Sequence, residues 1–200
     1  MIKDKKDLKR YLNNEKRFYI APTLYQHMLQ VLTCDSQVQV YKFIKYLRHE
    51  EYHHNQSGPF HKLLRLYYWR KRRKLGNRLG LVIWDNSFDE GLFIYHAGNI
   101  VVNGSAKIGK NCKLHGSNCI GNNGKTLACP TLGNNVRLGV GAKVIGDVTI
   151  ADDVIIAAGA VVVHSVLEPG ITVAGVPARK VSKSQPAKPA DEPSIMTQTI

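Results

Sequence analysis

Cysteines are few in this chain of 200 residues, and their spacing excludes two common uses of the thiol. The four cysteines at positions 34, 112, 119 and 129 form no CxxC pair and no disulfide-like framework. Long apolar runs are absent as well, because none reaches the roughly eighteen residues that a transmembrane helix needs. The basic start, residues 1–6, is not followed by the apolar core of a signal peptide. We therefore expect a cytoplasmic protein.

Acidic residues are scarce in the first 80 positions. Residues 1–80 contain eighteen Lys or Arg against six Asp or Glu, a net charge of +12, whereas residues 81–200 contain ten against nine, a net of +1. No acid occurs from Tyr52 to Trp84, and eight cations fall within residues 62–78. The excess of positive charge therefore belongs to the N-terminal part of the chain.

The C-terminal part repeats with a period of six. One aliphatic residue recurs at every sixth position, with Thr126 as the single exception, and the members are Val102, Ile108, Leu114, Ile120, Leu132, Leu138, Val144, Ile150, Ile156 and Val162. Six is a multiple of the strand period of two but not of the helical period, so an extended chain keeps all of them on one face. The segments Gly109–Asn111 and Gly133–Asn135 supply turns between them. A β-sandwich would space its strands less regularly, so the period predicts a three-sided parallel β-helix.

Helical patterning fills residues 1–80. Tyr25, Met28, Leu29 and Leu32 form one apolar stripe, a second helix is expected from Val38 to Arg48, and a third begins near Pro59. After residue 181 the chain contains four prolines and no periodicity, so residues 182–200 are predicted to be disordered. The expected fold class is α+β, with an α-helical unit at 1–80 followed by the β-helix at 81–181.

Two histidines and one loop are the candidates for chemistry. His96 stands where an aliphatic side chain was due, and its imidazole could take a proton from a hydroxyl or be a structural histidine in an irregular coil. His115 follows a core position where Gly or Ala is usual, so its side chain must leave the prism. The segment 121–130 interrupts the repeat and is either a lifted binding loop or a degenerate coil. The other histidines have no cysteine partners, and no metal site is expected.

Three segments then resemble a known family: Tyr-His-Ala-Gly-Asn-Ile-Val-Val at 95–102, Gly-Val-Gly-Ala-Lys-Val-Ile-Gly at 139–146, and Ala-Gly-Val-Pro-Ala-Arg at 174–179. They resemble the serine acetyltransferase branch of the hexapeptide-repeat acyltransferases over about residues 80–181. The histidine segment is specific to this branch, and the other two are widely shared. The resemblance implies a left-handed β-helix. Residues before 80 are unlike the longer helical domain of serine acetyltransferases and closer to the short basic leader of relatives encoded with polysaccharide genes.

The resemblance also implies roles for individual residues. A base at His96 would deprotonate an acceptor hydroxyl that attacks the thioester of acetyl-CoA, and Asp85 or Asp89 would replace the orienting aspartate, whose aligned position is Leu81. The acceptor is expected near Tyr95, His115, Asn122 and Cys129. The donor, acetyl-CoA, is expected along Lys125, Gly139, Ala142 and Ala160, with its phosphates near Arg179 and Lys180. The resemblance further implies a site between neighbouring prisms of a homotrimer.

Departures from the family pattern decide the expected acceptor. Ala128-Cys129 stands before Pro130, where serine acetyltransferases have an Arg-His pair, and an Arg there would suit a substrate carboxylate. Its absence favours an O-acetyltransferase that acts on a sugar hydroxyl in surface polysaccharide assembly. A serine O-acetyltransferase and a scaffold without catalysis are the alternatives.

The basic segment 59–78 is either a solvated helix that aids solubility or a contact for an anionic membrane surface. Tyr67, Tyr68 and Trp69 interleave with its cations, a mixture that suits the inner face of a membrane. Nucleic acid is not an expected partner, because no recognisable binding motif accompanies the charge.

Overall fold

The computed structural model describes residues 1–183, and residues 184–200 of the predicted tail lie outside the described residues. Four helices come first. They are α1 (Lys5–Tyr19), α2 (Leu24–Leu32), α3 (Ser36–His54) and α4 (Pro59–Leu79). Side chains of Asp4, Thr23 and Asp35 cap the first three, and Pro59 opens the fourth. The predicted helices are confirmed, and α1 is an additional one. No helix within residues 1–183 is long and apolar enough to cross a bilayer.

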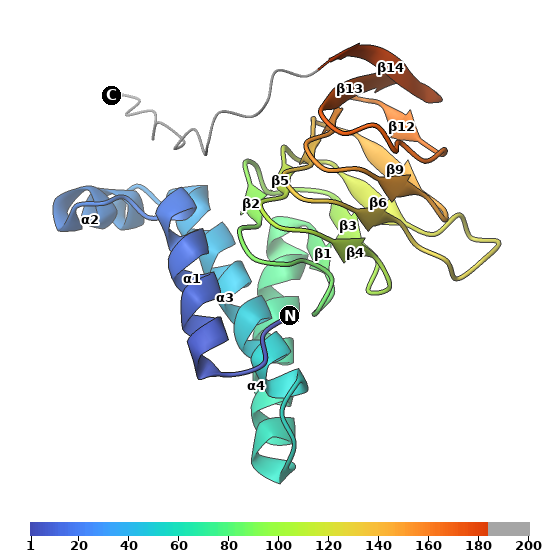
Figure 1. Cartoon of the computed structure of the whole chain (residues 1–200). Coiled ribbons are helices and arrows are strands. Elements are labelled where there is room, and N and C mark those ends of the chain that lie inside the picture. The colour runs from blue at the N-terminus through green and yellow to red at the C-terminus, as the bar shows by residue number, and fades with distance from the viewer. Residues whose placement is uncertain (184–200) are drawn as a thin grey trace.

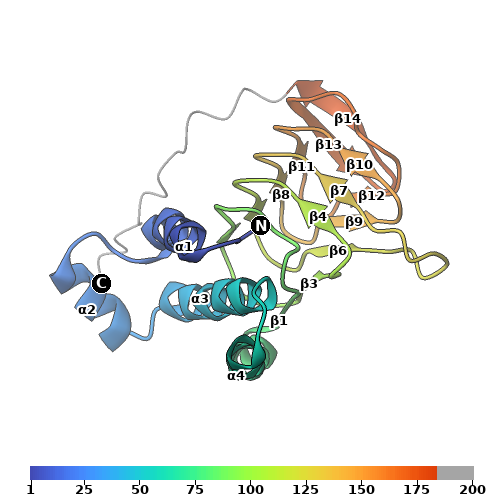
Figure 2. The same ribbon diagram turned by 60° about the horizontal axis from the view of Figure 1, so that its bottom comes forward.

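Short strands follow, and nearly all of them pair in parallel. They are β1 (Leu81–Ile83), β2 (Phe93–Ile94), β3 (Ile100–Val102), β4 (Lys107–Ile108), β5 (Lys113–Leu114), β6 (Cys119–Gly121), β7 (Thr131–Leu132), β8 (Arg137–Leu138), β9 (Lys143–Ile145), β10 (Thr149–Ile150), β11 (Ile155–Ile156), β12 (Val161–Val162), β13 (Ile171–Gly175) and β14 (Ala178–Lys183). Three sheets result, with orders β1-β3-β6-β9-β12, β4-β7-β10 and β2-β5-β8-β11-β13-β14. From β3 to β12 successive strands visit the three sheets in turn, so the chain winds as a stack of coils (Figure 2).

The six-residue period is confirmed by the core. All ten aliphatic repeat residues are buried, each 4% exposed or less, and the smaller residues between them also point inward. Cys112 is one of these, and burial raises the pKa of its thiol to about 12. The antiparallel pair β13–β14 ends the described chain and includes Ser182 and Lys183, two residues that the sequence assigned to the tail.

Asparagines form the turns of one corner, as the sequence predicted. Asn111, Asn135 and Asp153 have φ of 57°, 57° and 60°, a left-handed conformation that Asn and Asp tolerate better than most side chains. Their side chains are also linked from coil to coil. Asn111 donates to Asn135 at 3.1 Å and Asn135 to Asp153 at 3.0 Å, so the turns are tied along the prism.

The helices cover the end of the prism where the first coil has no preceding neighbour (Figure 1). There the exposed edge of β2 is satisfied by side chains. The Tyr19 hydroxyl donates to the Leu92 carbonyl at 3.1 Å and accepts from the Ile94 N–H at 2.8 Å. Buried Arg48 donates to the carbonyls of Phe88 and Asp89. These bonds replace the strand that an earlier coil would have provided.

Candidate functional site

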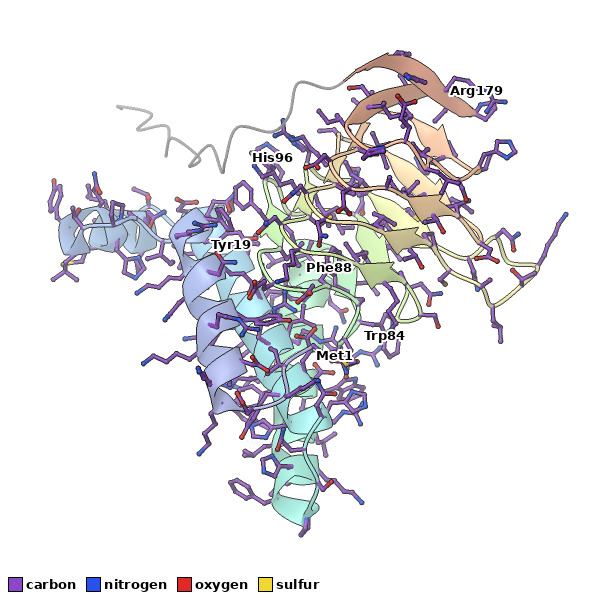
Figure 3. The ribbon with its side chains drawn as sticks, viewed as in Figure 1. Met1, Tyr19, Trp84, Phe88, His96 and Arg179 are labelled. Carbon is purple, nitrogen blue, oxygen red and sulfur yellow. The ribbon has the colours of Figure 1, made fainter. Side chains whose placement is uncertain are left out.

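His96 lies at the corner after β2, and its side chain is exposed (Figure 3). The Tyr95 N–H donates to the Leu114 carbonyl at 2.8 Å, and the Ser117 N–H donates to the Gly98 carbonyl at 3.1 Å. The corner segment is therefore held on one side by the following coil. A solvent-facing imidazole on a fixed backbone can reach a ligand that approaches this corner.

A second histidine lies beside it. The rings of Tyr95 and His115 stack with centroids 4.1 Å apart and an interplanar angle of 16°. Burial first, and then the electrostatic effect of the neighbouring Arg137, His96 and Lys113 side chains, lower the pKa of His115. The imidazole of His115 is therefore neutral at pH 7. Its Nε2 is buried and has no hydrogen-bond partner within residues 1–183.

The other side of the corner is held by a helix. Gln37, in the first turn of α3, donates from Nε2 to the Tyr95 carbonyl at 2.5 Å. The Gln37 N–H is fixed in turn by the Asp35 side chain that caps α3, at 2.8 Å. No sequence pattern indicated a role for Gln37, because Gln37 and Tyr95 are separated by 58 positions in the chain.

Asp85 and Asp89 do not orient His96. Asp85 contacts His54 at short distance and lies 3.6 Å from the Arg65 guanidinium. Asp89 accepts a short hydrogen bond from Tyr11, and although burial opposes the effect, this bond and the Glu90 N–H lower its pKa. The segment before β2 crosses the open end of the prism and turns both carboxylates toward the helices. Within residues 1–183, neither of these two carboxylates forms a hydrogen bond or ion pair with His96.

The predicted loop leaves the prism between β6 and β7 (Figure 1). The Asn123 side chain accepts the backbone N–H of Lys125 at 3.0 Å and of Thr126 at 3.1 Å, which shapes the tip. Asn122 is partly buried, Lys125 is exposed, and Cys129 packs against the core. This loop joins the sheets of β6 and β7, whereas His96 lies between the sheets of β2 and β3. One chain therefore does not bring Asn122, Lys125 or Cys129 to His96.

The expected donor residues are spread along the prism. A Cβ at Gly139 would lie 2.6 Å from the Ala158 nitrogen, so only glycine fits this close approach. Ala142 and Ala160 point into the core, and their N–H groups donate to Gly139 and Ala157 within their own turns. The backbone N–H groups of these two expected donor residues are thus already used within the protein.

Arg179 and Lys180 lie at the far end of the prism, on the β13–β14 hairpin (Figure 3). Arg179 is exposed, and Lys180 pairs with Glu168 at 2.6 Å. From β2 to β13 the sheet advances by four strands, or roughly 19 Å at about 4.8 Å a step. Within residues 1–183 no cluster of His, Cys, Asp or Glu that could hold a metal ion is present.

Comparisons with known proteins agree on the C-terminal part. Residues 129–164 match the family described as bacterial transferase hexapeptide (six repeats). The serine acetyltransferase of Synechococcus elongatus is 38% identical over 97 residues, which are 48% of this chain and 39% of that protein. That of Helicobacter pylori strain J99 is 39% identical over 97 residues, covering 48% of this chain and 56% of that protein. The chain therefore spans about half the length of these relatives, or less.

Solved structures share the fold over more of the chain. The serine acetyltransferase of Brucella abortus matches with a TM-score of 0.70 at 23% identity, covering 90% of this chain and 71% of that one. The soybean apoenzyme matches with a TM-score of 0.69 at 22% identity, covering 88% and 69%. A serine acetyltransferase in complex with CoA gives a TM-score of 0.58 at 26% identity, covering 72% and 57%.

These comparisons overturn the sugar acceptor expected from the sequence. The relatives and structural neighbours are named serine acetyltransferases, which corresponds to the alternative and not to the main prediction. The sugar prediction rested on the missing Arg before Pro130 and on the likeness of residues before 80 to the basic leader of relatives encoded with polysaccharide genes. Neither the missing loop residue nor the leader was a sufficient basis for choosing the acceptor.

Proposed function

We propose that the protein is an acetyl-CoA-dependent O-acetyltransferase with L-serine as acceptor, because residues 129–164 match the hexapeptide-repeat transferases and its β-helical part is similar to serine acetyltransferases. The proposed coil is left-handed, and the proposed units are the helices at 1–80 and the β-helix at 81–181. The observation that carries the proposal is the exposed His96 at a fixed corner, beside the stacked pair Tyr95 and His115. The relatives named above support the acceptor.

In the proposed reaction His96 is the general base. Its imidazole removes the proton of the acceptor hydroxyl as the oxygen attacks the thioester carbonyl of acetyl-CoA. The C–S bond then breaks, and the proton passes from His96 to the sulfur of the leaving CoA. His115 stays neutral and contributes a wall of the site together with Tyr95.

The test is the release of free CoA with L-serine as acceptor. We expect His96→Ala to lower kcat by at least about 10²–10⁴-fold, the usual contribution of a general base, while the KM for acetyl-CoA changes by no more than a few-fold. His164→Ala, an exposed histidine near the other end of the prism, is the matched control and keeps parent activity. Near-parent turnover by His96→Ala would end the assignment. A parent protein that binds acetyl-CoA but transfers to no hydroxyl would favour the scaffold.

A homotrimer is part of the proposal. The loop with Lys125 and the corner with His96 lie on different edges of one prism, so both can serve one site only if they come from neighbouring chains. Sedimentation at assay concentrations should give three times the monomer mass of 22.3 kDa. A fully active monomer would rule out a shared site.

We also propose a peripheral membrane contact through α4. Four exposed apolar side chains, Phe60, Leu63, Leu66 and Tyr67, lie on its first half. Its second half presents the outer cations of α4, which are Arg70, Lys71, Arg73 and Lys74. Arg72 does not belong to them, because it is buried and bonded to Glu50, the closest contact being 2.6 Å. Each of the outer cations adds about 1 kcal/mol of attraction near an anionic surface.

A further inference from the structure

A cationic strip lies next to the catalytic corner. In the sheet that begins with β2, Phe93 pairs with Lys113 and Lys113 pairs with Arg137. Side chains two positions further along each strand point to the same face. Tyr95 and His115 therefore share the outer face with Lys113 and Arg137.

The Arg137 guanidinium is the charge that this face offers to a ligand. Gly139 follows Arg137 by two positions, so no side chain lies beside His115 in the following coil, where the backbone of Ala157 and Ala158 comes close. The Arg137 side chain is partly exposed, and it takes part in none of the ion pairs that join acids and bases elsewhere in residues 1–183. His115 lies one strand across and two residues along from Arg137, a diagonal of about 8 Å between their backbones that the long Arg137 side chain can bridge.

The charge acts where the reaction is proposed to occur. Burial lowers the pKa of His115, and the nearby cations Arg137 and Lys113 lower it further. These two cations favour an acceptor that carries a negative group. A guanidinium binds a carboxylate with two parallel hydrogen bonds, which also fixes the direction of the bound molecule.

We propose that Arg137, assisted by Lys113, binds the carboxylate of the acceptor and thereby directs its hydroxyl toward His96. The acceptor class is a small hydroxy acid or hydroxy amino acid. This inference rests on the proposed function and explains how a chain with Ala128 in place of the loop arginine accommodates an anionic acceptor. The cation comes from strand β8 of the prism and not from the loop after β6.

The experiment compares L-serine with L-serinamide, which keeps the hydroxyl but lacks the carboxylate. We expect Arg137→Gln to raise the KM for L-serine by about 10–100-fold, the loss typical of a hydrogen-bonded charge. The KM for acetyl-CoA and the activity with L-serinamide should stay within about two-fold, and Arg137→Lys should restore part of the loss. Lys107→Gln, which removes an exposed cation of β4 in another sheet, is the matched control.

Binding measurements separate this inference from the proposed catalysis. Titration calorimetry of L-serine is made with the full-length parent and with Arg137→Gln, each also in a His96→Ala background. Binding that Arg137→Gln weakens supports the site even if no turnover is seen, in which case only the proposed function fails. Equal losses for L-serine and L-serinamide, or an unchanged KM and unchanged binding, would overturn the assignment of Arg137. So would a parent protein that neither binds nor acetylates L-serine.

Discussion

Replacing Arg48 with methionine tests the buried charge cluster that joins the helices to the prism. Arg48 is 0% exposed and bonds to Glu15 at 2.5 Å and Glu51 at 2.8 Å, besides the two carbonyls before β2. Methionine retains an apolar stem but leaves Glu15, also 0% exposed, without its cation. Removing one partner of a buried ion pair costs about 3–5 kcal/mol. At a urea dependence of about 1–3 kcal/mol per molar, the unfolding midpoint should fall by roughly 2 M.

The pH dependence of stability distinguishes the loss of the Arg48 charge from the loss of its packing. Burial raises the pKa of Glu15, and Arg48 opposes this rise, so the pKa must rise further when Arg48 is removed. A carboxyl whose folded pKa exceeds its unfolded pKa binds more protons in the folded state, and stability then falls as pH increases. The difference in unfolding free energy between the parent and Arg48→Met should therefore widen as pH rises from about 4.3, the pKa of the unfolded carboxyl, through its raised folded pKa.

Urea unfolding is followed by circular dichroism at one fixed protein concentration. Arg10→Met is the matched control, because Arg10 is exposed and its pairs with Asp7 and Glu90 lie on the surface. The control should unfold at the parent's midpoint. An Arg48→Met unfolding midpoint equal to the parent's, or a difference in unfolding free energy that does not change with pH, would refute the reasoning.

Three further predictions concern α4, the corner of His96 and the core. Replacing all four outer cations of α4 with Gln should reduce salt-sensitive binding to vesicles that contain anionic lipid and leave turnover unchanged; a parent protein that does not bind such vesicles would show that the charge serves solubility. Gln37→Glu replaces the donor to the Tyr95 carbonyl with an acceptor. It should lower kcat by about 10–100-fold with little change in the KM for acetyl-CoA. Gln39→Glu, which changes an exposed residue of the same helix, should leave kcat at the parent value. Iodoacetamide should label Cys112 only after unfolding, because its thiol is buried and has a raised pKa; labelling of the native protein at the rate of exposed Cys34 would contradict this.

The repeat was predictable because each coil obeys the same local rule. An inward side chain at every sixth position contacts the equivalent residue one coil away, so Leu114 pairs with Leu138 and Ile120 with Val144. The positive φ of Asn135 follows from the same periodicity, since a turn must fall between two anchors. Local rules of this kind can be read without knowledge of distant contacts.

The partners of the charged residues could not be predicted in this way. Asp85 was assigned to catalysis from its nearness in sequence to His96, but it meets His54, which lies 31 positions away. Arg72 was counted with a solvent-facing charge run, but it is buried against Glu50, 22 positions away. In both cases a helix supplies the partner, and the rotation of that helix about its axis is set by packing.

The helices hold the backbone at the corner of His96 in place. A β-helix has an open first coil, and the N–H and carbonyl groups of its edge must be satisfied by something other than another coil. Here Tyr19 satisfies the edge of β2 from α1, and Gln37 continues the same edge from α3 to the carbonyl of Tyr95, the residue before His96. The backbone that carries the proposed base is therefore fixed by the prism on one side and by α3 on the other. A change that shifts α3 must move His96 relative to the rest of the prism, even though no residue of α3 is expected to touch a substrate.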